Sequence, residues 1–295
     1  MPFAKLDSRS LLQLTGKDIR DFLQNLVTND LEPLSSEKAV YAALLTPQGK
    51  FLHDFLILED ENALYLDCLT ERTSDLVRRL TLYKLRADVL IEDVTDHWDL
   101  CAEFGTDTEE ASSLSLGQVE MHETYRRYRD PRQESLGYRI IGKKGTNWLD
   151  EFGSPSMADE AVYHDLRLSL GIPEGGRDIQ PEKNFLLEMN FEELHGVSFS
   201  KGCYVGQELT ARTKHRAKIK KRLFHFTFDG DIDVGSPIRL GDKEIATVTA
   251  FSTPNGLALT RLDGWEKAKQ SDTPLKPEGL TLQKPDYVNL PATET

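Results

Sequence analysis

The chain contains one octapeptide that is unlike the rest of it: Lys201-Gly202-Cys203-Tyr204-Val205-Gly206-Gln207-Glu208. Two glycines bracket a cysteine, and Gly202 can take a backbone conformation that is closed to other residues. The run from Gln207 to Arg216 is compatible with a helix. The sequence therefore predicts that Cys203 lies in a loop directly before a helix N-terminus.

This position favours the thiolate form of Cys203. The positive end of the helix, together with the cations of Lys201 and Arg212, stabilises the negative charge on sulfur. One hypothesis is therefore a reactive cysteine that attacks electrophiles or binds a soft metal; the other is a thiol that fills a small apolar notch beside the turn. Both hypotheses stay open. Cys68 and Cys101 fall within apolar strand patterns, so we predict that they are core residues.

The cysteine count limits the metal chemistry. The chain has 3 cysteines and lacks a C-x-x-C pair, which argues against a zinc site and against a permanent iron-sulfur cluster held by this chain alone. Sparse, odd cysteines are typical of a reducing compartment. The N-terminal residues show no apolar core of a secretory signal and no arginine-rich presequence. The sequence thus predicts a cytoplasmic protein without a permanent metal.

Composition and pattern predict a folded, water-soluble α+β protein. The chain has 295 residues, of which 39% are hydrophobic and 29% charged, and its formal net charge is −13. This balance argues against a nucleic-acid or anionic-membrane coat, and the apolar runs are too short to span a membrane. We expect a monomer that has no membrane or direct nucleic-acid partner.

Periodicity separates two regions near residue 221. Before it, helices and strands alternate. The expected helices cover 16–28, 158–170 and 207–216, and a further helical stretch has Leu76, Val77, Leu80 and Tyr83 on one face. The expected strands cover 39–46, 51–58, 63–68, 87–91, 98–104, 119–127 and 137–141. After it, short alternating strands indicate a small all-β unit, and prolines from Ser271 onward indicate a wrapping or loosely ordered tail.

A basic run follows the octapeptide. Seven cationic side chains lie within eleven residues of an otherwise acidic chain: Arg212, Lys214, Arg216, Lys218, Lys220, Lys221 and Arg222. Such a run can bind phosphate, a polyglutamate tail or an acidic partner, or it can be a solvated helix face. A second segment, Tyr125–Arg132, alternates aromatic rings with guanidinium groups, which suits either a carboxylated heterocycle or a charged strand edge.

The octapeptide resembles the K-G-C-Y-x-G-Q-E signature of the YgfZ family of folate-binding proteins, which includes related mitochondrial iron-sulfur assembly factors. The likeness extends over nearly the whole chain, through 27–31, 41–50, 130–132, 136–139 and 171–174. That family is similar to the aminomethyltransferase of glycine cleavage. The resemblance implies two α+β lobes in residues 1–220 and a C-terminal β-barrel with an irregular tail in residues 221–295, around a central opening for tetrahydrofolate.

The resemblance also implies a function and its residues. It implies a tetrahydrofolate-dependent factor, with the folate in mono- or polyglutamylated form, that assembles or repairs iron-sulfur clusters in client enzymes, and thereby indirectly affects cluster-bearing tRNA modification enzymes. Cys203 would be the functional residue and a transient metal ligand, within the motif Lys201, Gly202, Cys203, Tyr204, Gly206, Gln207 and Glu208. The implied folate-binding residues are Tyr41, Asp54, Arg132, Tyr138 and Arg167.

Two departures from the transferase pattern weaken the folate site. His53-Asp54 stands where the transferase has an acidic pair, and Ser135 stands at the place of the glutamate that grips the pterin ring. Losing such a buried partner costs about 1–3 kcal/mol. Two alternatives therefore stay open. The first is a folate-dependent one-carbon transferase in which Cys203 is structural and Asp54 orients the folate; the second is a binding scaffold that uses the basic run.

Overall fold

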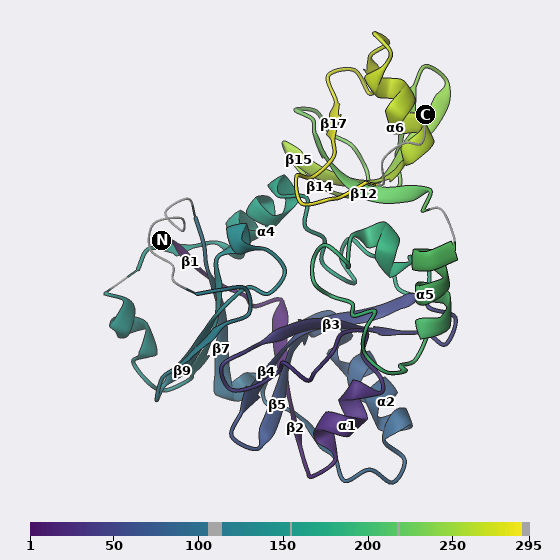
Figure 1. Cartoon of the computed structure of the whole chain (residues 1–295). Helices are drawn as coiled ribbons and strands as arrows, with labels where there is room; N and C mark the ends of the chain where they lie inside the picture. The colour runs from purple at the N-terminus through teal and green to yellow at the C-terminus, as the bar shows by residue number, and fades with distance from the viewer. Residues whose placement is uncertain (106–113, 154, 217–218, 291–295) are drawn as a thin grey trace.

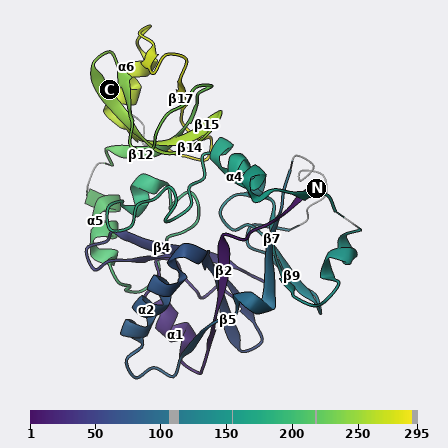
Figure 2. The same cartoon turned by 180° about the vertical axis from the view of Figure 1, so that it is seen from behind.

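The computed structural model describes residues 1–105, 114–153, 155–216 and 219–290. Within these residues the strands form three antiparallel-rich sheets, which Figures 1 and 2 show from opposite sides. Two of the sheets lie in the N-terminal part of the chain, and the third lies apart from them at the C-terminal end. Helices α4 (Glu160–Ser169) and α5 (Gln207–Arg216) lie between the third sheet and the other two.

The first sheet has the strand order β3-β4-β5-β2-β6. Its strands are β2 (Arg9–Thr15), β3 (Val40–Leu45), β4 (Phe51–Asp60), β5 (Ala63–Leu69) and β6 (Leu90–Asp93). Every residue of β3 is buried, because both faces of this sheet are covered. Val40, Ala42 and Leu44 face a core formed with the helices α1 (Ile19–Gln24) and α2 (Thr73–Lys84). Tyr41 and Ala43 face a second core, in which Tyr41 stacks on Phe191 at 5.2 Å and to which strands of the second sheet also contribute.

Of two sequence predictions for this region, the hairpin is confirmed and the first helix is shorter than predicted. The hairpin around Pro47–Lys50 is confirmed, since β3 and β4 pair antiparallel. The helix expected over 16–28 is shorter, because the chain leaves helical geometry to pair with β3. Val27 forms a bridge with Leu44, and the backbone N–H of Thr28 donates to the carbonyl of Ala43 at 2.9 Å.

The second sheet has the strand order β11-β1-β7-β10-β9-β8. Its strands are β1 (Phe3–Lys5), β7 (Trp98–Glu103), β8 (Val119–Met121), β9 (Tyr125–Arg129), β10 (Tyr138–Lys143) and β11 (Met157–Ala158). The single strand expected over 119–127 is two strands that pair with each other. Short 3₁₀ turns connect elements of the two sheets and precede the Cys203 loop: η1 (Thr70–Arg72), η2 (Thr95–His97), η3 (Glu134–Leu136), η4 (Trp148–Phe152) and η5 (Leu186–Met189).

The third sheet has the strand order β16-β13-β14-β15-β12-β17. Its strands are β12 (Lys221–Thr227), β13 (Pro237–Leu240), β14 (Lys243–Ser252), β15 (Asn255–Arg261), β16 (Leu275–Lys276) and β17 (Thr281–Gln283). We propose residue 221 as the boundary between the two regions of the chain, because β12 begins there.

Two expectations for this C-terminal region are wrong. It is not built from strands alone, since α6 (Leu262–Lys269) packs on the sheet through Trp265, whose ring meets Phe224 edge-on at 5.0 Å. Residues after Ser271 are also not irregular throughout, because β16 and β17 form the two edges of the sheet. The prolines flank these short strands rather than prevent them. Residues 291–295 of the tail lie outside the described residues.

Candidate functional site

Cys203 lies in an exposed loop just before α5, as the sequence predicts. It lines a surface cavity of about 910 Å³. Three elements that are distant in sequence form the walls: Pro47 from the β3–β4 turn, Tyr83 from the end of α2, and the first turns of α5 with Glu208 and Arg212. The loop cysteine is therefore accessible from solvent and stands beside a helix N-terminus, whose positive end favours an anion.

The other two cysteines are core residues, as predicted. Cys68 and Cys101 are buried, and burial raises the pKa of each thiol to about 12. All three cysteines are free thiols. Among the described residues there is no group of three or more His, Cys, Asp or Glu side chains that could hold a metal ion. A metal at Cys203 therefore needs ligands from outside the described part of the chain.

Lys201 has a different position from the one that the sequence suggests. Its side chain is only 7% exposed, and its ammonium group donates to the backbone carbonyls of Gln24, Val27 and Asn29 at 2.7, 2.7 and 2.8 Å. Burial lowers the pKa of Lys201 to about 8, with Asp30 acting in the opposite direction. Lys201 thus ties the Cys203 loop to the segment that follows α1, and its charge points into the protein.

The remaining motif residues hold the loop in place. Tyr204 is buried, and burial raises the pKa of its phenol to about 12. The side-chain amide of Gln207 donates to the carbonyl of Gly202 at 3.4 Å, which closes the loop across Cys203. Glu208 is exposed and lines the cavity. A Cβ at Gly202 would meet nothing within 4 Å, so the special conformation expected there is not required; Gly206 carries the positive φ, at 82°.

The basic run does not form one cationic face. Arg222 is buried, donates to Asn190 Oδ1 at 2.9 Å and pairs with Glu193. Lys214 pairs with Glu192, whereas Arg212 and Lys220 are exposed. Lys218 lies outside the described residues, and Lys221 begins β12. Local carboxylates therefore neutralise part of the run, which leaves Arg212 as the member that lines the Cys203 cavity.

The Tyr125–Arg132 segment is turned to internal partners. Strand β9 lies between β10 and β8, so it is not the sheet edge that one interpretation required. Arg126 Nε donates to Asp60 Oδ2 of the first sheet at 2.7 Å, and Arg127 Nε donates to Glu103 Oε2 at 2.7 Å. Arg126 and Arg127 thus join strands and sheets of the chain, whereas the buried guanidinium of Arg129 lies 4.8 Å from the Tyr138 ring and has Nε and Nη1 without a hydrogen-bond partner among the described residues.

The implied folate residues are buried, and the structure brings only some of them together. The hydroxyl of Tyr41 donates to Asp54 Oδ2 at 2.7 Å, and the Arg132 guanidinium lies 5.6 Å from the Tyr41 ring. Burial raises the pKa of Asp54 and, well above its usual range, that of Tyr41. Tyr138 points the other way, because it shares the outer face of β10 with Ile140 and lies under Arg127 at 3.6 Å.

Residues that the sequence did not single out complete this cluster. Arg139, on the inner face of β10, donates to the Tyr163 hydroxyl at 3.1 Å. Arg9 Nε donates to Asp67 Oδ1 at 2.6 Å, and Arg9 Nη1 donates to Glu174 Oε1 at 3.0 Å. Burial opposes the ionisation of Glu174, but the guanidinium groups of Arg9 and Arg167 outweigh it and lower its pKa. The sequence signal for this network was the presence of charged residues, such as Arg9 and Asp67, within otherwise apolar strands.

The residues present do not fit tetrahydrofolate bound by the five implied side chains. Arg132 donates from Nε and Nη2 to both carboxylate oxygens of Asp130, at 3.0 and 2.7 Å. Arg167 pairs with Asp178, and Asp54 also accepts from the backbone N–H of Gly175 at 3.3 Å. These polar groups already bind each other. His53, at the lost acidic position, bonds to Asp75 of α2 at 2.9 Å instead.

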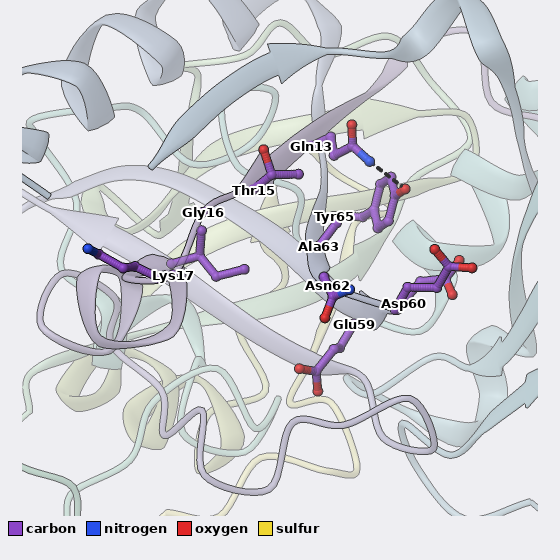
Figure 3. Close-up of a pocket in the computed structure, with 11 residues that line it drawn as sticks. Gln13, Thr15, Gly16, Lys17, Glu59, Asp60, Asn62, Ala63 and Tyr65 are labelled. Atoms are coloured by element: carbon purple, nitrogen blue, oxygen red, sulfur yellow. Dashed lines mark hydrogen bonds between the residues drawn. The ribbon is translucent and has the colours of Figure 1, made fainter. Parts of the chain in front are cut away.

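A second cavity, of about 650 Å³, opens beside the β2–β5 pair (Figure 3). Its wall includes Gln13, whose side-chain amide donates to the Tyr65 hydroxyl at 2.7 Å. Two of its carboxylates are neutralised within the chain: Glu59 by Arg20 at 2.6 Å, and Asp60 by Arg126. None of its lining residues is shared with the Cys203 cavity.

Two separate parts of the chain match known protein families. Residues 7–130 match the GCVT N-terminal domain, and residues 220–289 match the CAF17 C-terminal beta-barrel domain. The aminomethyltransferase T of the glycine cleavage system from Bartonella henselae has the same fold, with a TM-score of 0.74 at 16% identity over 97% of this chain and 86% of that one. The expected aminomethyltransferase-like α+β fold with a C-terminal β-barrel is therefore confirmed.

Three of the curated relatives are named as the mitochondrial iron-sulfur cluster assembly factor IBA57 or as a homolog of it. The mouse protein is 34% identical over 85% of this chain and 72% of its own length. The human protein is 35% identical over 76% and 65%, and the Neurospora crassa homolog is 30% identical over 74% and 52%. The word mitochondrial in these names contradicts the cytoplasmic location expected from the sequence. Among the described residues, no helix is long and apolar enough to cross a membrane.

Proposed function

Because the chain belongs to the IBA57 family of iron-sulfur cluster assembly factors, we propose that it acts in the assembly of iron-sulfur clusters and that Cys203 is its iron-contacting residue. One observation carries the proposal: Cys203 is the exposed cysteine of the three and lines a cavity, whereas Cys68 and Cys101 are buried. Accessibility matters because a thiolate must reach the metal directly.

The step that we propose is a ligand exchange. The Cys203 thiol releases its proton to solvent as its sulfur bonds to an iron atom of the incoming cluster. The iron loses its bond to an outgoing thiolate, which takes up a proton, so that no oxidation state changes. The other iron ligands belong to the partner that delivers or receives the cluster.

Substitution of Cys203 tests the proposal in cells that lack this protein. Cys203→Ser should abolish the recovery of [4Fe–4S] enzyme activity that the wild-type chain restores. Ser200→Ala, in the same exposed loop, is the matched control and should restore activity fully. Full recovery with Cys203→Ser would refute the role of the thiol.

Spectroscopy separates ligand exchange from the two other roles of a reactive thiol. Iron bound to Cys203 gives a thiolate-to-iron charge-transfer band that Cys203→Ser removes. A persulfide or a mixed disulfide on Cys203 gives a mass increase of the chain without that band. Measuring both the mass of the chain and its absorbance during anaerobic cluster transfer therefore distinguishes iron ligation from a persulfide or a mixed disulfide.

Membership of the YgfZ family in particular stays a prediction, and the role proposed here does not include the tetrahydrofolate dependence that the resemblance implies. The closed network around Asp54 supports a cluster-assembly step that does not pass through folate, and it argues against the one-carbon transferase. Calorimetric titration with mono- and polyglutamylated tetrahydrofolate should give no heat. Heat that disappears in Asp54→Asn would show that the network opens for a pterin.

The scaffold alternative has little support, because the cationic side chains of the basic run do not form one face. The client enzymes of the proposed role would include tRNA modification enzymes that carry iron-sulfur clusters.

A further inference from the structure

The end of α2 exposes apolar side chains next to the Cys203 cavity. The inner face of the helix is buried through Leu76 and Leu80. At its C-terminal end, Leu82 is 65% exposed, Tyr83 is 37% exposed and Leu85 is 88% exposed. Large apolar side chains at this exposure are typical of interaction surfaces when they occur together. We call residues 82–86 the α2 end.

The backbone holds Leu85 outward. Leu85 has φ 47° and ψ −104°, and the N–H of Ala87 donates to the carbonyl of Lys84 at 2.8 Å around it. A positive φ is unfavourable for a bulky residue, and glycine would adopt it without a side-chain clash. A strained leucine that displays its side chain to solvent gives the fold no packing in return.

Tyr83 joins the α2 end to the proposed functional site, since it lines the same cavity as Cys203. Lys84 and Arg86 belong to the α2 end and Arg212 lines the cavity, in a chain whose formal net charge is −13. The acids in this region are Glu208, which lines the cavity, Asp88, and Asp18, whose carboxylate accepts from the backbone N–H of Asp88 at 2.8 Å. Arg212 thus places a cation in the cavity itself, and an iron-sulfur cluster with thiolate ligands is anionic.

We propose that the α2 end is the docking surface for the protein that carries the cluster to or from Cys203. This proposal rests on the proposed function. The described residues supply no set of three metal ligands, so a cluster at Cys203 must be held by a second molecule at the mouth of this cavity. That molecule presents an apolar patch to Leu82 and Leu85, and an acidic rim with its cluster to the cationic side chains.

A double variant tests the docking surface in the full-length chain. Leu82→Ser with Leu85→Ser should lower the recovery of [4Fe–4S] enzyme activity in cells by roughly tenfold, as expected when two interface anchors are lost. The rate at which iodoacetamide labels Cys203 should stay unchanged, because the site itself is intact. Val162→Ser with Val234→Ser removes two exposed valines elsewhere, 47% and 57% exposed, and should have no effect.

Photo-crosslinking identifies the occupant. A benzophenone amino acid at position 85 should capture an acidic protein that carries an iron-sulfur cluster when purified, and the same probe at position 234 should not. Wild-type recovery by the double variant, or identical captures at both positions, would overturn the docking proposal. If Cys203→Ser restores full enzyme activity, the proposed function is wrong. If Cys203→Ser abolishes the recovery but Leu82→Ser with Leu85→Ser does not change it, the proposed function stands and the docking surface is wrong.

Discussion

Gly206 lies directly against Gly49. A Cβ added at Gly206 would be 3.1 Å from the Cα of Gly49 and 2.5 Å from the carbonyl oxygen of Thr46. The Cys203 loop and the turn of the β3–β4 hairpin can approach this closely because neither glycine has a side chain. The contact joins segments that are far apart in the sequence and fixes the base of the loop that presents Cys203.

Replacement of Gly206 by alanine should destabilise the protein by about 2–4 kcal/mol, because the new methyl group meets backbone atoms and the residue has a positive φ. Urea unfolding measures the change. Gly202→Ala, in the same loop, is the matched control: its Cβ meets nothing within 4 Å, so we expect an effect within about 0.5 kcal/mol. Equal losses for the two variants would contradict the contact described here.

Lys201→Met should destabilise the protein by about 1–3 kcal/mol, because it leaves the carbonyls of Gln24, Val27 and Asn29 without their shared donor. The same variant should also change the labelling rate of Cys203, since the loop loses its anchor. Lys220→Met alters an exposed lysine and should leave both quantities nearly unchanged. A Lys201→Met chain with wild-type stability would show that the anchor contributes nothing.

Iodoacetamide should label the native protein at Cys203 alone. Cys68 and Cys101 are buried, and their thiols, with pKa raised to about 12, carry almost no thiolate at neutral pH. Mass spectrometry of the digested protein locates the label, and a urea-denatured sample should react at all three positions. Labelling of Cys68 at the rate of Cys203 in the native protein would be inconsistent with this fold.

His53 should make stability depend on pH. Burial, aided by Arg72, lowers the pKa of His53 to about 4, against the hydrogen bond to Asp75. Between pH 6.5 and 4 the unfolded chain binds a proton at His53 that the folded chain does not, so the free energy of unfolding falls as the pH falls. The contribution over this range is about 2–3 kcal/mol.

His53→Gln removes this contribution and keeps a side-chain amide that can donate to Asp75. The difference in the free energy of unfolding between wild type and variant should shrink steadily from pH 6.5 to pH 4. Chemical denaturation at a series of pH values gives the difference. Parallel curves across this range would mean that the pKa of His53 is the same in the folded and the unfolded protein.

Much of the local structure could be predicted from patterns within short windows. The hairpin at Pro47–Lys50, α5 over Gln207–Arg216 and the core positions of Cys68 and Cys101 depend on periodicity and turn residues that neighbours in the sequence supply. The fold class followed from a motif resemblance, which the structural comparison confirms. Helix α6 and the edge strands β16 and β17 were missed because packing on the third sheet, rather than local propensity, stabilises them.

The candidate site divides in the same way. The sequence by itself determined that Cys203 lies in a glycine-flanked loop before a helix, because chain neighbours alone produce that geometry. Only the tertiary structure decided where charge and side chains point: Lys201 turns inward to three carbonyls, Tyr138 faces away from Asp54, and Tyr83 joins the Cys203 cavity. Such contacts arise between segments that are distant in sequence, and the burial that sets their electrostatics exists only once those segments have packed together.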